Sequence, residues 1–127
     1  MYKLIIVDDE PQISSLLMKY FNKLKDDSGQ VKFDVAVFNG GNACIEYIES
    51  GGKADLILSD MRMPEGGGID ILKYLNDSNN KIPLFFMTGF AGDINLDDVI
   101  NMGAKKIFQK PFKLLEIAQE LEKAINF

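Results

Sequence analysis

The chain has 127 residues, of which 46% are hydrophobic and 26% are charged, and its formal net charge is −5. This length predicts one domain, residues 1–127, that buries a core of its own. The sequence contains no histidine, which excludes Ser-His-Asp and Cys-His catalysis and nearly every zinc site. The acidic balance argues against a surface that binds nucleic acid.

The single cysteine, Cys44, lies among apolar neighbours, and we interpret it as a packing residue rather than a reactive thiol. A lone cysteine and the lack of a signal peptide fit a reducing, cytoplasmic location. No apolar run approaches the roughly 18 residues that a membrane helix needs. We therefore expect a cytoplasmic protein with no membrane contact.

Strands and helices alternate along the sequence. Three continuous apolar runs, residues 4–7, 56–58 and 84–87, are typical of parallel strands that are covered on both faces. Residues 33–38 are less uniformly apolar, which indicates an edge strand. Ile107 and Phe108 indicate a short fifth strand.

Apolar residues at three- and four-residue spacing predict the helices between these strands. We expect Leu16 to lie on the inward stripe of the first helix and Ile100 on that of the fourth, with Asp93 as the cap of the fourth helix. The expected helices span residues 11–24, 42–50, 69–75, a fourth that begins near 93, and 113–125.

This alternation predicts an α/β three-layer sandwich around a parallel sheet. Right-handed crossovers make all parallel strands end at the same edge of the sheet. Ligands in such folds bind at that carboxyl edge. The residues that follow each strand should therefore meet in one cleft.

Four of the predicted strands end in polar residues that are suited to phosphate chemistry. Polar strand ends are common because loops are solvated, so each residue alone is a weak signal. Gathered carboxylates repel: at about 4 Å and an effective dielectric constant of roughly 20, each pair costs about 4 kcal/mol. The residues at these ends are Asp8, Asp9 and Glu10, then Asp60, then Thr88, then Lys110.

Such an acidic cluster requires a cation or a held proton. Hard oxygen ligands without histidine or cysteine favour Mg²⁺ or Mn²⁺ over zinc. A carboxylate such as Asp60 is able to act as a nucleophile and form an aspartyl phosphate. Thr88 and Lys110 would then bind the phosphoryl oxygens, and catalysis would consist of positioning and charge neutralisation.

The motifs at these positions, in this order and at this spacing, resemble the receiver domain of two-component response regulators (CheY-like). The resemblance covers essentially the whole chain, and it rests on the ordered set because each motif alone is weak. The motifs are Ile6-Val7-Asp8-Asp9-Glu10-Pro11, Asp60-Met61-Arg62-Met63-Pro64 with Gly68, Met87-Thr88-Gly89, and Lys110-Pro111-Phe112.

The resemblance implies that Asp60 accepts a phosphoryl group from a phosphohistidine on a sensor histidine kinase or a histidine phosphotransfer protein. It implies that Asp8 and Asp9, with Asp60 and the backbone carbonyl of Arg62, hold Mg²⁺, with Mn²⁺ as an alternative. It further implies a cis Lys110–Pro111 bond and a doubly wound, flavodoxin-like sheet with strand order 2-1-3-4-5. The domain would be a phosphorylation switch rather than an enzyme, and would act on a downstream protein or through an output domain.

The sequence departs from the family pattern at several positions. Ile107 occupies the place of the aromatic switch residue, and Phe108, one position later, should face the core. Phe90, two positions after Thr88, is expected to hinder water and slow the loss of the phosphoryl group. We expect Lys105 and Lys106 to be solvated.

Other interpretations stay open at this point. The glycine-rich segment that ends at Gly68 lacks the GxxxxGK[ST] motif of a phosphate-binding loop. We therefore expect Gly68 to serve the backbone instead, with a positive φ before the third helix. A phosphatase that works through an aspartyl phosphate would need an Asp-x-Asp pattern after the first strand, whereas here two adjacent acids, Asp8 and Asp9, follow it. A flavin-binding protein would not carry acids there, because they would repel the flavin phosphate. A scaffold that works without phosphorylation has the same fold. Whether this is a stand-alone receiver or part of a longer regulator is left open.

Overall fold

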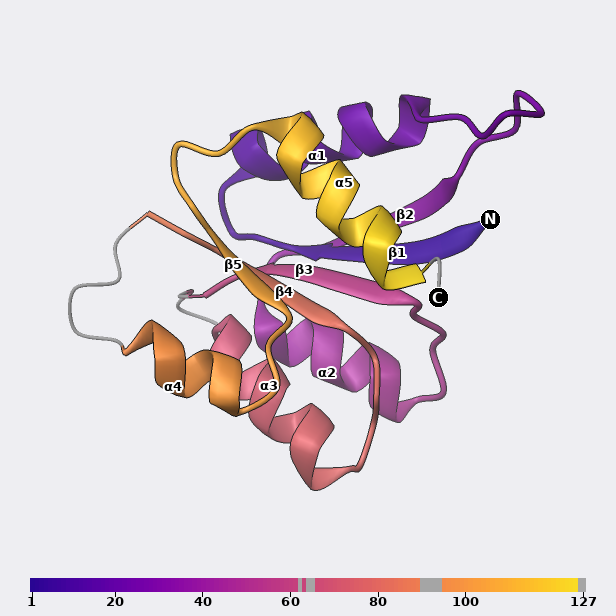
Figure 1. Ribbon diagram of the computed structural model, residues 1–127. Helices are drawn as coiled ribbons and strands as arrows, with labels where there is room; N and C mark the ends of the chain where they lie inside the picture. Colours follow the sequence, from indigo (N-terminus) through magenta and orange to yellow (C-terminus); the bar gives the residue numbers. More distant parts are fainter. Residues whose placement is uncertain (62, 64–65, 90–94, 126–127) are drawn as a thin grey trace.

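The computed structural model describes residues 1–61, 63, 66–89 and 95–125. Within these residues, five parallel strands form one sheet in the order β2-β1-β3-β4-β5, and five helices alternate with the strands (Figure 1). This confirms the predicted doubly wound fold. The elements are β1 (Tyr2–Val7), α1 (Pro11–Lys23), β2 (Phe33–Phe38), α2 (Gly41–Glu49), β3 (Leu56–Asp60), α3 (Gly68–Asp77), β4 (Leu84–Thr88), α4 (Leu96–Asn101), β5 (Lys106–Gln109) and α5 (Leu114–Ile125).

The helices form a layer on each face of the sheet. Helices α1 and α5 cover one face, and α2, α3 and α4 cover the other (Figure 1). Successive residues of a strand point to opposite faces, so β1 contributes to two separate cores. Leu4 and Ile6 belong to the core on the α1–α5 side, whereas Ile5 and Val7 belong to the core on the α2–α3 side. The continuous apolar run of β1 follows from this two-sided burial.

The central strands extend slightly further than their apolar runs. Asp60 pairs with Met87, and Thr88 pairs with Gln109, in parallel register. Both polar residues are therefore the last residues of their strands rather than the first residues of a loop. Their side chains are fixed by the sheet itself.

The prediction that Leu16 faces inward was wrong. Leu16 is 50% exposed, and Ser14 is buried on the same helix instead. The Ser14 hydroxyl donates a hydrogen bond to the carbonyl oxygen of Pro11 (3.3 Å), so its burial leaves no donor unsatisfied. Apolar spacing alone did not distinguish the two sides of α1.

Helix α4 also differs from its prediction. Its N-cap is Asn95, whose side-chain oxygen accepts hydrogen bonds from the backbone N–H groups of Asp97 (3.0 Å) and Asp98 (3.3 Å). The expected cap, Asp93, was therefore wrong, and that residue lies outside the described part of the chain. Ile100, expected to face inward, is 42% exposed because α4 is short and buries only Val99.

Phe108 and Ile107 lie on opposite faces of β5, as predicted. Phe108 is buried on the α1–α5 side and stacks on Phe85, with ring centroids 6.3 Å apart. Ile107 is half-buried and packs against the core on the α2–α3 side. The position that the receiver-domain resemblance assigns to an aromatic switch residue thus holds a branched aliphatic side chain.

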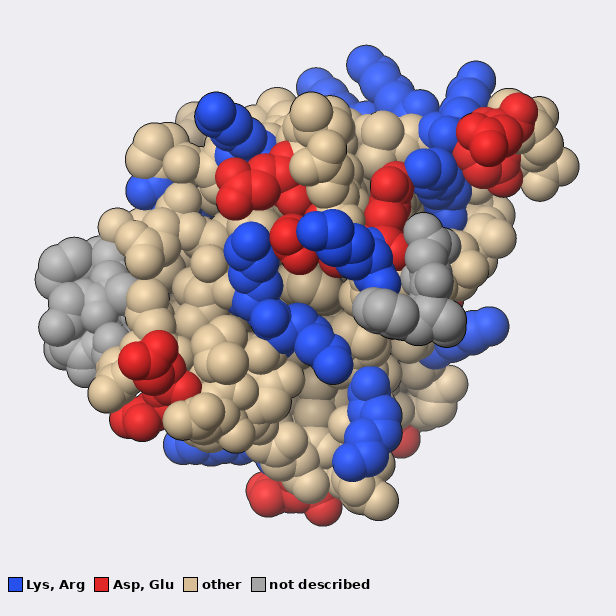
Figure 2. Space-filling model, viewed as in Figure 1, with Lys and Arg blue, Asp and Glu red and all other residues tan. Residues whose placement is uncertain are grey.

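Lys105, which precedes β5, and Lys106, its first residue, lie in different environments. Lys105 is exposed, as expected, but Lys106 is not simply solvated. Its ammonium lies 3.4 Å from Glu120 and 5.7 Å from the centre of the Phe108 ring. Glu120 also pairs with Lys123 (3.5 Å), and acidic and basic side chains intermingle over this face of the molecule (Figure 2).

Cys44 is buried against the apolar residues of α3, and burial raises the pKa of its thiol to about 12. The thiolate is therefore scarce at neutral pH, and the interpretation as a packing residue is confirmed. Among the residues that the structure describes, no helix has the length and apolar character to cross a bilayer.

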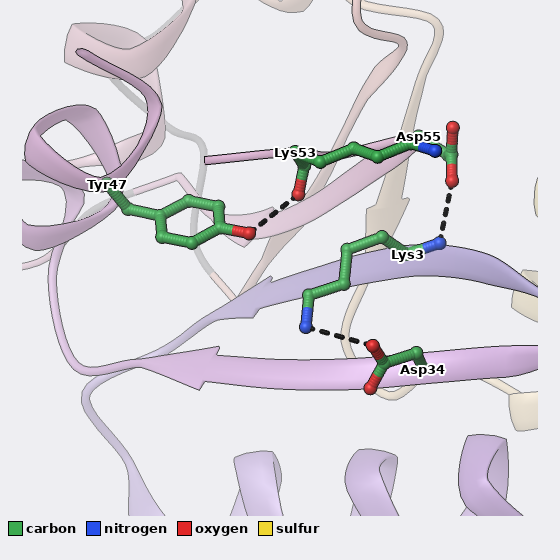
Figure 3. A network of polar contacts seen from close by, with 5 residues as sticks. All are labelled: Lys3, Asp34, Tyr47, Lys53 and Asp55. Carbon is green, nitrogen blue, oxygen red and sulfur yellow. Dashed lines mark hydrogen bonds and ion pairs between the residues drawn. The ribbon is translucent and has the colours of Figure 1, made fainter. Parts of the chain in front are cut away.

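The amino edge of the sheet is held by complementary polar contacts (Figure 3). The backbone N–H of Lys3 donates to Asp55 Oδ2 (2.7 Å), and the Lys3 ammonium lies 3.2 Å from Asp34 Oδ2. The Tyr47 hydroxyl donates to the carbonyl oxygen of Lys53 (2.8 Å). These contacts join β1 to β2 and to the connection between α2 and β3.

Candidate functional site

The parallel sheet brings four of its strand ends together at the carboxyl edge. Strands β1, β3, β4 and β5 are consecutive neighbours in the sheet. Asp60 and Thr88 end β3 and β4, while Asp8 and Lys110 directly follow β1 and β5. The predicted convergence of these four side chains therefore follows from strand order and direction.

Three carboxylates form a compact acidic cluster. Asp8, Asp9 and Asp60 each offer an oxygen atom, and these atoms lie within 4.8 Å of one another. Asp8 and Asp60 are buried, and Asp9 is exposed. The cluster thus has a buried base and one side open to solvent.

Asp8 has the least satisfied environment of the cluster. Its Oδ1 accepts a hydrogen bond from the backbone N–H of Glu10 (2.9 Å). Its Oδ2 is buried and, among the described residues, accepts no hydrogen bond. Burial, together with the negative charge of Asp60, raises the pKa of Asp8 from 3.8 to about 6, although the Glu10 N–H bond and Lys110 oppose the shift.

A bound cation would relieve this arrangement. An unsatisfied buried oxygen and three converging carboxylates, without nitrogen or sulfur ligands, match the hard oxygen ligands that Mg²⁺ prefers. The residues at this edge therefore fit a divalent metal ion. The fourth expected ligand, the backbone carbonyl of Arg62, lies outside the described residues, as does Phe90.

Lys110 places its ammonium beside the cluster. Its Nζ lies 3.5 Å from Asp60 Oδ2 and 3.6 Å from Glu10 Oε1. Burial alone would lower the pKa of Lys110, but attraction to Asp60, Asp8 and Glu10 outweighs it and raises the pKa. The ammonium therefore stays charged at neutral pH. Sequence reasoning placed Glu10 among the acids of this edge but did not predict its ion pair with Lys110, which depends on the packing of two loops.

The backbone fixes Lys110 and Asp60 relative to β4. The backbone N–H of Lys110 donates to the carbonyl oxygen of Thr88 (2.8 Å), and the Lys110–Pro111 bond is cis, as predicted. The buried hydroxyl of Ser59 donates to the carbonyl oxygen of Asp60 (2.8 Å). The sequence gave no signal for Ser59, because it is one more residue within a buried strand.

The loop after Asp60 begins and ends in close backbone contacts. Met61 N–H donates to Met87 O (2.9 Å), and Gly68 N–H donates to Met61 O (3.1 Å). A Cβ atom on Gly68 would overlap the Phe86 ring and lie 2.8 Å from the carbonyl oxygen of Asp60. Gly68 does not have a positive φ, so that prediction was wrong: glycine is required there by lack of space.

Comparison with known proteins gives one consistent result. The sequence profile of the response regulator receiver domain matches residues 4–122. Sporulation initiation phosphotransferase F of Bacillus subtilis (strain 168) is 34% identical over 121 residues, which cover 95% of this chain and 91% of the relative. The transcriptional regulatory protein CpxR of Escherichia coli (strain K12) is 28% identical over 121 residues, and the chain spans only 48% of its length.

A solved structure has the same fold. The response regulator protein TrrA from Thermotoga maritima, in complex with Mg(2+)-BeF, superposes with a TM-score of 0.80 over 98% of this chain and 100% of that chain, at 20% sequence identity. The fold, the ordered motifs and the profile match over nearly the whole sequence agree. The chain therefore belongs to the response regulator receiver domain family.

Proposed function

We propose that Asp60 is a phosphoryl acceptor that takes the group from a phosphohistidine on a sensor histidine kinase or a histidine phosphotransfer protein. The observation that carries the proposal is the convergence of Asp8, Asp9 and Asp60 within 4.8 Å, with the Lys110 ammonium 3.5 Å from Asp60. A partner must supply the phosphohistidine because this chain contains no histidine.

In the transfer, an Asp60 carboxylate oxygen attacks phosphorus while the bond between phosphorus and the donor nitrogen breaks. The product is an aspartyl phosphate, and the imidazole leaves with its electron pair and takes up a proton. Lys110 neutralises negative charge on the phosphoryl oxygens. The Thr88 hydroxyl, at the adjacent strand end, binds one of them. In dephosphorylation, water attacks the same phosphorus atom while the bond between phosphorus and the Asp60 oxygen breaks, which releases phosphate and the free carboxylate.

Asp8, Asp9, Asp60 and the backbone carbonyl of Arg62 would hold a Mg²⁺ ion, and Mn²⁺ has the same ligand preference. When bound, the ion neutralises charge on the phosphoryl oxygens and on the carboxylates. The buried, unsatisfied Asp8 Oδ2 supports this assignment. Asp8 and Asp9 have no part in bond making, and act by fixing the ion and the charge balance beside Asp60.

The consequence would be a phosphorylation switch in cytoplasmic signal transduction. In this role the domain assists its own phosphorylation and dephosphorylation but turns over no separate substrate. It would signal to a downstream protein or through an output domain, as the longer relative CpxR carries a receiver in about half its length. Because Ile107 replaces the family's aromatic switch residue, the readout would not depend on a swinging ring.

The test is incubation with acetyl phosphate and Mg²⁺, followed by intact mass spectrometry. We expect one added phosphoryl group on the wild type and none on Asp60→Asn. The matched control is Asp34→Asn, which removes the same charge at the opposite edge of the sheet and should be phosphorylated normally. A wild-type chain that forms no adduct with acetyl phosphate, carbamoyl phosphate or a phosphorylated kinase would instead favour a scaffold that works without phosphorylation.

A finer proposal concerns the lifetime of the adduct. Phe90, two positions after Thr88 in the sequence, would hinder the water that attacks the aspartyl phosphate. We expect the phosphorylated Phe90→Ala variant to decay faster than the phosphorylated wild type. Equal decay, followed by intact mass over time, would remove Phe90 from this role.

A further inference from the structure

Two glycine-containing segments, one after β2 and one after β3, meet at the carboxyl edge of the sheet. Gly41 is the first residue of α2, and Gly66 and Gly67 belong to the loop between β3 and α3. The backbone N–H of Gly41 donates to the carbonyl oxygen of Gly66 (2.8 Å). The two helices that carry these segments lie next to one another on the same face of the sheet (Figure 1). We call this contact the glycine clasp.

The glycine clasp has no room for a side chain at position 41. A Cβ atom on Gly41 would lie 2.8 Å from the carbonyl oxygen of Gly66 and 2.9 Å from that of Gly67. Both are backbone atoms, so no rotation of a flexible side chain relieves the overlap. Gly41 does not have a positive φ. Close approach of two backbones, rather than conformational freedom, therefore requires glycine here.

Further hydrogen bonds hold the β3–α3 loop near its junction with α3. Gly67 N–H donates to the Asp70 carboxylate (3.1 Å), and Gly68 N–H donates to Met61 O (3.1 Å). The loop begins directly after Asp60. Among the described residues, the contact from Gly41 comes from a different crossover, so a displacement at position 41 acts on the loop through Gly66.

We propose that Gly41 is a positioning residue for the phosphoryl site: the glycine clasp fixes Gly66, and Gly68, two residues later, packs so closely against Asp60 that a Cβ atom there would lie 2.8 Å from the Asp60 carbonyl oxygen. The proposal rests on the proposed function, since it assumes that Mg²⁺ binds at Asp8, Asp9 and Asp60. If Gly41 had only a local role in α2, replacing it with alanine would not weaken Mg²⁺ binding. Alanine favours the helix more than glycine does, so Gly41→Ala would then be neutral or stabilising.

The first part of the test uses the unmodified protein. Mg²⁺ is titrated into the wild type while backbone amide resonances are followed by NMR. The amides of Asp9 and Asp60 report the metal site, those of Gly41 and Gly66 report the glycine clasp, and that of Gly29, in the distant α1–β2 connection, is the reference. We expect both groups to shift with one midpoint and Gly29 to stay unchanged.

The second part compares two variants of α2. Gly41→Ala should raise the Mg²⁺ midpoint about 10-fold, the size of effect found when residues behind metal ligands are changed. At saturating Mg²⁺, phosphorylation of this variant by acetyl phosphate should still occur on Asp60. Ala43→Ser, an exposed substitution on the same helix, should leave the midpoint within about twofold of wild type.

The outcomes separate the two proposals. Shifts at Asp9 and Asp60 without shifts at Gly41 and Gly66, or an unchanged midpoint in Gly41→Ala, would overturn the role of the glycine clasp and leave the acceptor site standing. No shift at any of the four amides would overturn both. If Gly41→Ala does not fold, the wild-type titration alone decides, since the amides of Gly41 and Gly66 shift with Mg²⁺ only when the glycine clasp is coupled to the metal site.

Discussion

The two edges of the sheet differ in how far their charged side chains are compensated by neighbouring groups. At the amino edge, Lys3 meets Asp55 through its backbone N–H and Asp34 through its ammonium (Figure 3). At the carboxyl edge, three carboxylates lie within 4.8 Å of one another, and the ammonium of Lys110 is shared between Asp60 and Glu10. The amino edge is balanced by its own side chains, whereas the carboxyl edge carries surplus negative charge.

The two edges therefore differ in what a bound cation would change. Balanced pairs gain nothing further from a ligand. The buried Asp8, with its pKa raised to about 6, is stabilised by any cation that enters the site. The carboxyl edge thus lowers the stability of the free protein, and a bound cation would restore it. Five measurements test whether the two edges differ in this way.

The largest effect is expected for Lys110→Ala. Loss of the ammonium that neutralises the phosphoryl oxygens should slow phosphorylation by acetyl phosphate at saturating Mg²⁺ by about 100-fold. Lys3→Ala removes a lysine of the amino edge, and its rate should equal that of the wild type. The measurement is the rate of adduct formation by intact mass. Similar rates for the two variants would mean that the lysine at the carboxyl edge matters no more for phosphorylation than the lysine at the amino edge.

The affinity for Mg²⁺ should depend on pH because a proton competes for Asp8. Since the pKa of Asp8 is about 6 without metal, the apparent affinity should fall about tenfold per pH unit below that value and level off above it. Calorimetric titrations across this range would measure the slope. A flat profile would show that Asp8 does not exchange a proton for the metal.

Asp8→Asn should stabilise the metal-free protein. The pKa of Asp8 is raised on folding, so the stability that this carboxyl retains below pH 3.8 is lost as the pH rises through about 6. At neutral pH the variant should therefore gain on the order of 1–3 kcal/mol, and the gain should vanish below about pH 4. Urea unfolding at several pH values, in the presence of a chelator, measures this difference.

The matched change at the amino edge should have the opposite sign. Asp55→Ala leaves the partly buried backbone N–H of Lys3 without its acceptor and should cost about 1 kcal/mol. A stabilised Asp55→Ala, or a destabilised Asp8→Asn, would contradict the contrast between the edges.

The smallest effect is expected for Asp34→Asn. Its ion pair with Lys3 is solvent-exposed, with 57% of the Asp34 side chain accessible, so its loss should change the free energy of unfolding by less than about 1 kcal/mol. The remaining difference should shrink at high salt. A larger, salt-insensitive loss would show that this pair contributes more to the amino edge than an exposed pair should.

The sequence predicted the fold and the acidic cluster because both depend on local pattern. The apolar runs of β1, β3 and β4 identified buried parallel strands, and their direction placed Asp8, Asp60 and Thr88 at one edge. The opposite orientations of Ile107 and Phe108 followed from the alternation of side chains along a strand. These predictions needed only the period of the apolar pattern and the right-handedness of the crossovers between parallel strands.

Helix faces and caps were predicted less well. The apolar pattern of α1 did not reveal that Ser14, rather than Leu16, is buried. Leu16 is spaced at helical intervals from Ile13 and Tyr20, which are only half-buried, whereas Ser14 lies in line with the buried Leu17 and Phe21. The start of α4 was misplaced because Asp93 and Asn95 are both suitable cap residues, and the choice depends on how the chain leaves β4. Such choices are made by packing rather than by propensity.

The order of residue types along the chain already places acids and other polar groups at the strand ends, and therefore predicts an acidic, oxygen-lined edge. How these residues meet depends on the packing of the whole domain. That packing leaves one oxygen of Asp8 without a hydrogen bond among the described residues, links Glu10 to Lys110, places Lys106 over Phe108 and brings Gly41 against the β3–α3 loop. A local pattern fixes strands and their ends, whereas a contact between separate crossovers joins residues that are far apart in the sequence.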